Sequence, residues 1–527
     1  MRAPATPALG DLAPTRWPLA WGQSVVMLAL LLPWVNPFAP FPSSAVVQSL
    51  LSVVGLALLL LLPLKRDGVA VLAQTNASVW LCAALLSCVL ALIQYFGASA
   101  AWFPWVNGTA AGEAFANLRQ RNQFATLTSI GLLALIWVQA CGQPQARFQT
   151  QGRLPALAVS PAPAWAAAAL LAVGNALSSS RTGLLQLLMM SALLLGCRSW
   201  RNAQALRLLL VAVMAYLAAL LVMPWLAGFA FAESGMLSRL REIESSCQAR
   251  SQLWRNVIYL IAQRPWAGWG WGELDYAHFI TLYPGPRFCD ILDNAHNLPL
   301  HLAVELGLPA ALGICGLALY LMVRAQPWRE ADPTRQLAWG VLAVIGVHSL
   351  LEYPLWYGPF QLAFGVSLTL LWLTGSRFPA PPADVLATVY SGARGWLARA
   401  MVALGLVLAT ADVAMDYGRV RQFYLPLAER ASLYRNDTLA TTSRSGWFAH
   451  WVDFAELTTT MPDAYNAARL QAMAERLLHV SPEPRVIEKL IDTALLQQQA
   501  ERAQFYLVRY QAAFPREHAD WLRRHPG

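Results

Sequence analysis

Long apolar runs constrain the fold of this chain more than any other feature. Stretches such as VVMLALLLPW and LLSVVGLALLLLLPL carry no charge, and about 20 such residues in a helix cross a hydrocarbon core of roughly 30 Å. With 57% hydrophobic and 13% charged residues among 527, the chain has more apolar surface than a soluble protein of this size buries. We therefore expect an all-α polytopic membrane protein.

A hydropathy window predicts about 11 transmembrane helices. No small-residue cleavage site follows the first run, so we interpret it as a retained span and not a signal peptide. The fifth and sixth spans are short and separated by the polar stretch NALSSSRTG, which allows half-helices or tilted helices. The predicted spans lie near 18–35, 45–64, 78–96, 123–141, 163–178, 182–197, 206–230, 298–323, 336–351, 357–375 and 397–414.

The distribution of basic residues predicts the orientation, because cytoplasmic loops are enriched in Arg and Lys. Arg2, Arg16, Lys65, Arg66, Arg147, Arg153, Arg198, Arg201, Arg207, Arg324, Arg329, Arg335, Arg377, Arg394 and Arg399 all fall on one predicted side. That side is the cytoplasm. The predicted parts are a cytoplasmic N-terminus (1–17), seven spans (18–230), a long periplasmic loop (231–297), four spans (298–414) and a soluble periplasmic domain (415–527).

Three arginines break this charge rule. Arg119, Arg121 and Arg181 fall in short outer segments. A guanidinium group can hold phosphate bidentately and keeps its charge, so an anionic ligand at the outer surface is one interpretation. Snorkelling to the membrane interface is the other. The net charge of +9 fits an ordinary cytoplasmic arginine excess, and the absence of a basic helix or tail gives no support to nucleic-acid binding.

A polar cluster marks the junction between the long loop and the eighth predicted span. It contains Asp293, His296 and Asn297, and Glu305 follows inside the apolar run. Titratable residues at a membrane span are costly, so they indicate a functional site. His296 is suited to act as a general base, although a capping or structural role is the alternative. Asp290 or Asp293 could orient its ring, but loop carboxylates are more often only solvated.

Other polar positions have a structural interpretation. His348 and Glu352 are four residues apart, which predicts a structural pair on one helix face, although a position beside the site is the alternative. His301 is expected to be structural. The candidate supporting residues of the site are Asp293, Asn297, Glu305, His348 and Glu352. Glu305 in a span favours a contact inside the helix bundle. The run WAGWGWGE either anchors the chain at the membrane interface, which we favour, or stacks on sugar. Cys247 and Cys289 share the long loop, and a disulfide between them is an open question because spacing alone does not show proximity.

The tail from about Asp416 changes in character. Segments such as AARLQAMAERLLHV and RVIEKLIDTALLQQQ have the helical spacing of apolar residues, and Ser481, Pro482 and Pro515 punctuate them. These segments look like helix hairpins of the tetratricopeptide type, although they are too irregular to claim that repeat. We expect a small helical domain that contacts a partner or substrate protein.

Six stretches together resemble one family. They are NLRQRNQFAT (117–126), SSSRTG (178–183), ARSQLWRNVIYLIAQRPWAGWGWGE (249–273), DNAHNLPLHLAVELG (293–307), HSLLEYPLWY (348–357) and DYGRVRQFYLP (416–426). They look like the bacterial protein O-oligosaccharyltransferases of the PglL type, relatives of the O-antigen ligases and O-antigen polymerases with a GT-C-like fold.

That resemblance implies a reaction and its residues. An oligosaccharide would pass en bloc from undecaprenyl diphosphate to a Ser or Thr hydroxyl of a periplasmic protein such as a type IV pilin, at the bacterial inner membrane and without a metal or other cofactor. His296 would be the base. Arg181 and Arg250 would hold the diphosphate, with Arg119 and Arg121 as further candidates.

Two alternatives remain. An O-antigen ligase or polymerase would keep the chemistry and change the acceptor to lipid A-core or a growing glycan. The soluble tail favours a protein acceptor. A lipid-glycan transporter or flippase would also explain the spans, but we find no internal inverted repeat, and the polar residues gather toward one face.

Overall fold

The computed structural model describes residues 17–62, 68–141, 161–198, 200–229, 247–375, 393–442 and 445–525. These ranges are helical and contain no β-strand. Three parts of the predictions lie outside these described ranges. They are most of the predicted N-terminal segment, the first part of the predicted long loop, which includes Arg239 and Arg241, and several basic positions used for the orientation. Those basic positions are Arg2, Arg16, Lys65, Arg66, Arg147, Arg153 and Arg377.

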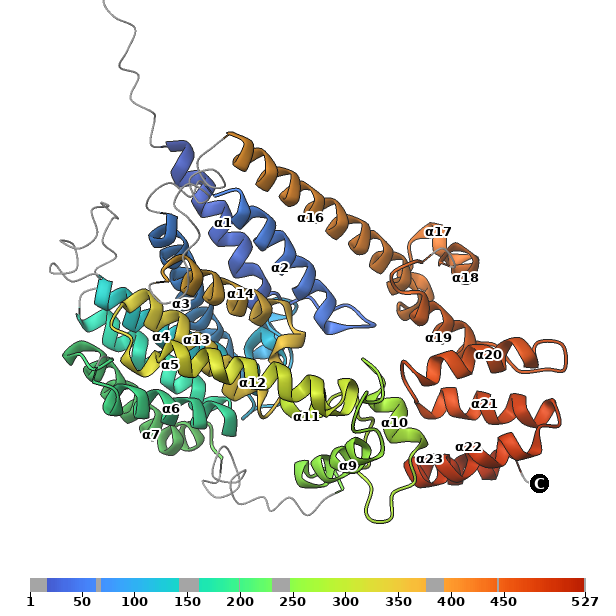
Figure 1. Cartoon of the computed structure of the whole chain (residues 1–527). Helices are drawn as coiled ribbons and strands as arrows, with labels where there is room; N and C mark the ends of the chain where they lie inside the picture. Colours follow the sequence, from blue (N-terminus) through green and yellow to red (C-terminus); the bar gives the residue numbers. More distant parts are fainter. Residues whose placement is uncertain are drawn as a thin grey trace, which may run out of the picture.

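A helix underlies each of the 11 predicted spans (Figure 1). Among the described residues, five helices are long and apolar enough to cross a membrane by themselves: α3, α4, α7, and the helices that begin at Leu308 and Arg394. The helices at the predicted spans are α1 (Trp17–Val35), α2 (Ser44–Leu60), α3 (Gly68–Tyr95), α4 (Arg121–Cys141), α5 (Pro161–Leu177), α6 (Arg181–Gly196), α7 (Ala203–Leu226), α12 (Leu308–Ala325), α13 (Pro333–Ser349), α14 (Gly358–Leu373) and α16 (Ala393–Val420). The chain is a multi-pass membrane protein.

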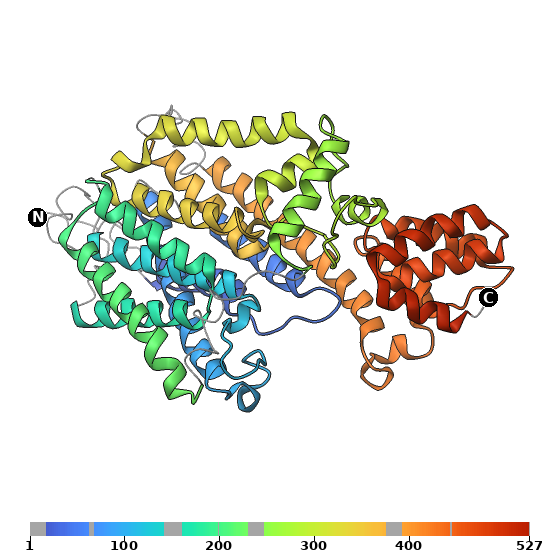
Figure 2. The same cartoon turned by 90° about the horizontal axis from the view of Figure 1, so that it is seen from below.

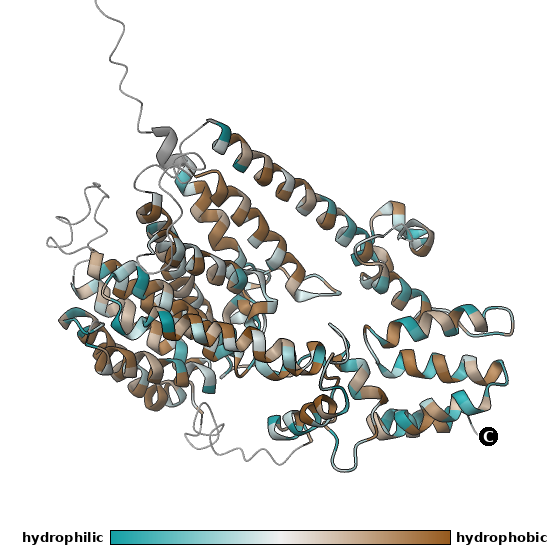
Figure 3. Cartoon of the chain, in the orientation of Figure 1, coloured by the Kyte–Doolittle hydropathy of each residue, from teal (hydrophilic) through white to brown (hydrophobic). Residues whose placement is uncertain are grey.

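Helix α4 forms the centre of the bundle. It packs against α3, α5, α6, α7 and α13, and Phe124, Leu127 and Ile130 are fully buried on it. By contrast, α12 and α16 expose most of their apolar side chains, and the hydropathy colours of Figure 3 mark much of both helices as hydrophobic. In a bilayer, lipid covers such surfaces at little cost, because acyl chains are as apolar as the side chains that they touch.

The eighth predicted span, 298–323, is wrong in its boundaries. The chain breaks at Gly307 into α11 (Leu298–Leu306) and α12. Gly307 has φ +86°, a conformation that side chains disfavour, and a Cβ there would lie 2.2 Å from the carbonyl oxygen of Trp266. The Trp266–Gly270 segment crosses the break, where Trp269 N donates to Val304 O at 2.9 Å. Of the two helices, only α12 is long and apolar enough to cross a membrane by itself.

Helix α11 belongs to a small unit built from the loop between α7 and α12. This loop unit comprises α9 (Arg250–Gln263), α10 (Leu274–Ile280) and α11. Its core contains Leu253, Val257 and Leu260 of α9 with Val304 of α11. A disulfide joins Cys247 to Cys289 with a Cα–Cα distance of 5.4 Å, which answers the question that the sequence left open.

The tail folds as a separate helical domain (Figure 2). The predicted boundary at residue 415 falls inside α16, which continues without interruption to Val420. Successive helices α20 to α23 lie side by side, as expected of helix hairpins. The tail helices are α17 (Ser432–Arg435), α18 (Thr438–Thr442), α19 (Ala449–Thr459), α20 (Ala467–Leu478), α21 (Pro484–Leu496), α22 (Ala500–Ala513) and α23 (Pro515–Arg524), and the short 3₁₀ helices of the chain are η1 (Ser99–Trp102), η2 (Ala116–Leu118), η4 (Pro327–Arg329), η5 (Pro354–Trp356), η6 (Arg421–Tyr424) and η7 (Leu427–Glu429).

Helix α10 joins the loop unit to the tail domain. Leu274 and Ala277 are buried in the core of the loop unit, while Phe279 is 2% exposed in the core of the tail domain. Around this contact, Arg509 Nε donates to the carbonyl of Ile280 at 2.8 Å. The loop that carries His296 is therefore packed against the tail domain as well as the membrane bundle.

Candidate functional site

Glu352 lies at the centre of a polar cluster where the loop unit meets the bundle. It is 5% exposed and sits in the turn between α13 and α14. Its Oε2 lies 2.6 Å from His296 Nδ1. Its Oε1 makes an ion pair with Arg250 Nη2 and accepts a hydrogen bond of 3.2 Å from Asn122 Nδ2. Three segments far apart in sequence thus converge on one buried carboxylate.

Local geometry fixes the position of His296. Its φ of +49° is unusual for a side chain with a Cβ, and its backbone N–H donates to Asn294 Oδ1 at 2.9 Å. The neighbouring Ala295 carbonyl accepts from Trp254 Nε1 at 3.0 Å. Asn297 caps α11, because its Oδ1 accepts a 3.0 Å hydrogen bond from Leu300 N. The cap that the sequence offered as an alternative for His296 is therefore made by Asn297.

The loop junction is also tied to the bundle. Asn297 Nδ2 donates to the carbonyl of Leu350 at 3.0 Å, two residues before Glu352. Arg250 begins α9, three residues after the disulfide-bonded Cys247. The hydrogen bond of Asn297 and the nearby disulfide therefore restrain the two segments that carry His296 and Arg250, the partners of Glu352.

The charge state of Glu352 follows from its neighbours. Burial alone would raise its pKa, but the hydrogen bond from His296 and the charges of His296 and Arg250 together lower the pKa of this carboxyl below its usual value. The carboxylate is therefore ionised and only accepts hydrogen bonds. His296 Nδ1 must then be the donor, which leaves Nε2 as the acceptor nitrogen of the neutral ring. No hydrogen bond from a described residue reaches Nε2.

A buried hydrogen-bond network continues from Glu352 into the bundle. Asn122 Oδ1 accepts from Ser180 Oγ at 2.6 Å, which connects the cluster to the first turn of α6. A second branch joins His348 Nδ1 to Thr126 Oγ1 at 2.9 Å, and Gln186 Nε2 donates to the same Thr126 oxygen at 2.9 Å. Buried polar groups of this kind stabilise one arrangement of helices when their bonds are made.

His348 and Glu352 do not form the structural pair that the sequence predicted. His348 is completely buried and turns toward Thr126, whereas Glu352 turns toward the loop. The reason is that α13 ends at Ser349, so Glu352 is free of the helix face that His348 occupies. The carboxylate that orients His296 is therefore Glu352, and not Asp290 or the exposed Asp293.

The other predicted arginines occupy different surroundings. Arg181 begins α6 directly after Ser180, which places it one residue from the Asn122 branch. Arg119 donates to the backbone carbonyl of Pro37 at 2.6 Å and to that of Asn117 at 3.2 Å. Arg121 is ion-paired with Glu113. Arg250 contacts the Glu352 cluster directly through its ion pair with Glu352, and it is carried by the loop unit.

Glu305 is buried in the loop unit and not within a span. It is 1% exposed, and its Oε2 lies 3.4 Å from His301 Nε2. Burial raises the pKa of Glu305 to about 7, an effect that the backbone amides of Gly272 and Leu274 only partly offset. Burial likewise lowers the pKa of His301 to about 4. Instead of the predicted contact inside the helix bundle, Glu305 makes this histidine–carboxyl pair in the loop unit.

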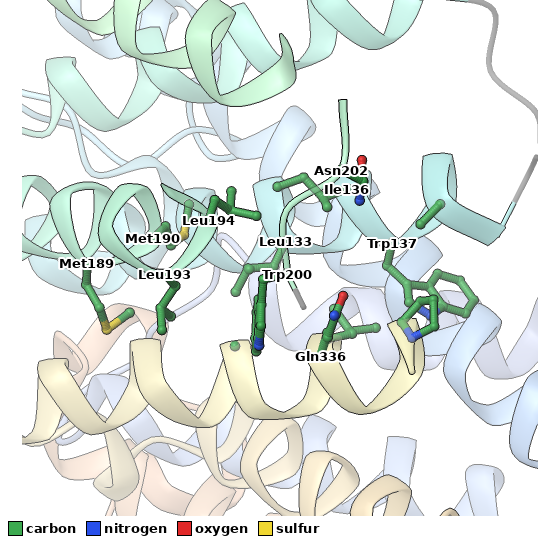
Figure 4. Close-up of a pocket in the computed structure, with 14 residues that line it drawn as sticks. Leu133, Ile136, Trp137, Met189, Met190, Leu193, Leu194, Trp200, Asn202 and Gln336 are labelled. Atoms are coloured by element: carbon green, nitrogen blue, oxygen red, sulfur yellow. The ribbon is translucent and has the colours of Figure 1, made fainter. Parts of the chain in front are cut away.

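A small apolar pocket lies away from this cluster. It is formed between α4, α6 and α13, has a volume of about 30 Å³ and is lined by side chains such as Leu133, Met190 and Trp200 (Figure 4). No titratable side chain lines it. The chemistry available in the described residues therefore points to the Glu352 cluster.

Three family models match successive parts of the chain. Residues 114–137 match a protein glycosylation ligase family, residues 166–321 match the O-antigen ligase family, and residues 336–526 match the C-terminal part of a virulence factor membrane-bound polymerase family. The Glu352 cluster draws residues from all three matches. The described helices form a multi-pass membrane protein, and these matches show that the chain is similar to the O-antigen ligase and protein glycosylation ligase families.

Two relatives narrow this class. The chain is 26% identical over 302 residues to the general O-oligosaccharyltransferase of Acinetobacter baylyi, covering 55% of this chain and 48% of that protein. It is 23% identical over 254 residues to the ComP-specific O-oligosaccharyltransferase of the same organism, covering 48% and 43%. The chain spans about half the length of these relatives. The predicted resemblance to PglL-type O-oligosaccharyltransferases is confirmed, and the matches support a glycosyltransferase.

Proposed function

We propose that this protein transfers a pre-assembled oligosaccharide en bloc from undecaprenyl diphosphate to Ser or Thr hydroxyls of a periplasmic or pilin-like protein. It would do so in the bacterial inner membrane, with the loop unit and tail domain in the periplasm and without a metal ion. The observation that carries the proposal is the His296–Glu352–Arg250 cluster, since it combines an oriented base with a cation at the junction of bundle and loop.

The acceptor hydroxyl is activated by His296. Glu352 accepts a hydrogen bond from Nδ1–H, which leaves Nε2 free to take the hydroxyl proton as the oxygen attacks the anomeric carbon. The bond between that carbon and the diphosphate oxygen breaks, and its electron pair leaves with the diphosphate. The imidazolium that forms lies against the carboxylate of Glu352, which stabilises its charge.

The leaving group is stabilised by arginine. Arg250 uses Nη2 for Glu352, and a guanidinium has five N–H donors, so others remain for phosphate oxygens. Its side chain is 32% exposed, which makes it reachable by a ligand. Arg181 is the second candidate because it begins α6 beside the Asn122 branch. Fixed cationic donors are what a departing diphosphate requires.

Reconstitution tests the proposal. Purified protein, a polyprenyl-diphosphate glycan and a pilin-like acceptor are combined with EDTA, and His296→Ala and Arg250→Ala are compared with wild type. Glycosylated acceptor from the wild type, with transfer lost in His296→Ala, is the expected result. Unimpaired transfer by His296→Ala would remove the proposed base.

A polymerase is the second candidate, favoured by the family match over residues 336–526. It uses the same donor, but the hydroxyl belongs to another lipid-linked glycan. In the same reconstitution, elongated lipid-linked glycan without glycosylated protein would favour this function over protein O-glycosylation.

A further inference from the structure

Two exposed tryptophans from separate segments stack beside the Glu352 cluster. Trp271 lies in the loop unit and Trp356 lies in η5, yet their ring centroids are 6.0 Å apart with an interplanar angle of 14°. Trp271 is 62% exposed and Trp356 is 37% exposed. Together they form an aromatic surface that is called the tryptophan pair below.

The tryptophan pair is held from behind. His301 is 2% exposed and lies edge-on to both rings, at 4.9 Å from Trp356 and 6.0 Å from Trp271. The positive φ values of Gly270 and Gly272 turn the backbone on either side of Trp271, and Gly270 N donates to the carbonyl of Glu305 at 3.0 Å. The exposed surface is therefore preorganised, which lowers the entropic cost of binding a ligand.

A single aromatic ring connects the pair to the base. Tyr353 packs edge-on against His296, with centroids 5.0 Å apart, and against Trp356 at 6.4 Å. A ligand held on the tryptophan pair is thus close to the reacting centre without occupying it. Interface anchoring does not require this connection, because an anchor needs only exposure to lipid headgroups.

The chemistry of the surface suits a sugar. A pyranose ring presents C–H bonds on its faces, and these pack on the electron-rich face of an indole. The pair is uncharged and its largest surface is aromatic, so it favours a neutral ring over phosphate or peptide carboxylate. Trp356 lies in the turn between α13 and α14. This is the end of the bundle that carries Glu352, where a lipid-linked glycan would lie.

We propose that Trp271 and Trp356 bind a pyranose ring of the lipid-linked glycan, beyond the sugar that carries the reacting anomeric carbon. This proposal rests on the proposed function. It assigns to the pair the selection and alignment of the donor, while His296 and Arg250 act on the reacting bond.

Kinetics with a long and a short donor test this assignment. With saturating acceptor, Trp356→Ala and Trp271→Ala should each raise the KM for the oligosaccharide donor about tenfold, with less change in kcat. In a separate titration of the acceptor, its KM should be unchanged. Trp356→Phe should recover most of the loss. With a polyprenyl diphosphate that carries one sugar, variants and wild type should have the same KM.

Trp266→Ala is the matched control. Trp266 lies in the same segment and is 81% exposed, but it makes no ring stack with the described residues, and its replacement should leave the donor KM unchanged. The proposal is overturned if Trp266→Ala and Trp356→Ala impair membrane insertion equally and Trp356→Ala raises the donor KM no more for the longer donor than for the shorter one. Both tryptophans would then be interface anchors.

Direct binding separates failure of this inference from failure of the proposed function. Binding of the oligosaccharide donor to the full-length protein in detergent is measured without any acceptor. Weaker binding by Trp356→Ala but not by Trp266→Ala supports the pair even where no protein acceptor is glycosylated. Equal binding by wild type and Trp356→Ala refutes the pair, whatever reaction the enzyme performs.

Discussion

Replacing Glu352 with Gln is the sharpest test of the site. The variant keeps the shape of the side chain but removes the charge that His296 and Arg250 share. An amide no longer requires His296 Nδ1 to be the donor, so the ring loses its fixed tautomer and the stabilisation of its protonated form. General base assistance is worth about 10²–10⁴ in rate, and we expect kcat to fall within that range.

The same substitution also affects stability. Removing one partner of a buried ion pair typically costs 3–5 kcal/mol. Because the side chains of Arg250 and His296 are 32% and 27% exposed, solvent screens part of that loss. We expect a decrease of about 2 kcal/mol in the free energy of unfolding, measured in detergent.

Acidification should affect wild type and variant differently. The folded pKa of Glu352 is depressed, so its contribution to stability is fully present above the unfolded pKa of about 4.3 and is lost as pH falls through the folded pKa. In Glu352→Gln that decrease should be absent. Glu330→Gln is the control, because it disrupts another Glu–Arg pair, with Arg335, at the opposite end of α13 from the site.

The kinetic comparison can refute the assignment. A Glu352→Gln enzyme with wild-type kcat would show that Glu352 does not orient the base. A fall in kcat matched by an equal fall in the fraction of folded protein would make Glu352 purely structural.

Three further predictions concern other parts of the chain. Wild type should lose roughly 3 kcal/mol of stability as pH rises from 4.5 to about 7, because ionisation of Glu305 is penalised in the folded state, and Glu305→Gln should abolish this loss; an unchanged pH–stability curve would contradict this. Gly307→Ala should cost about 2 kcal/mol in thermal unfolding through strain at positive φ and contact with backbone, whereas Gly313→Ala, with open space around it, should not. Phe279→Ala should weaken docking of the tail on α10 by about 3–5 kcal/mol, detected as faster hydrogen exchange in α10; exchange equal to that of exposed Leu433→Ala would show that Phe279 does not carry the contact.

The helix positions were predictable because hydropathy is a local property. A run of apolar residues requires a helix in lipid whatever surrounds it, since backbone groups must be satisfied within the segment. The 11 predicted spans accordingly each coincide with helical structure. The helix break at Gly307 is the exception, because the apolar composition continues across it. The helix ends there because the backbone of Trp266 passes close to Gly307.

The components of the site were also visible in the sequence. His296, Arg250 and Glu352 are each unusual as polar residues beside apolar runs, and the resemblance to a family supplied expected roles for the first two. The sequence offered Glu352 as a supporting residue beside the site but favoured a pair with His348, because a spacing of four suggests a shared helix face. Its contact with His296 was not predicted. The end of α13 at Ser349 is what separates the side chains of His348 and Glu352.

The sequence alone determined the class of fold, the positions of the long apolar helices and the candidate base and cations. The tertiary structure decided which of them meet: Glu352 reaches His296 across 56 residues and Arg250 across 102, Cys247 reaches Cys289, and Trp271 stacks on Trp356. The physical reason is that membrane insertion depends on the composition of each segment by itself, whereas these contacts depend on how separate segments pack.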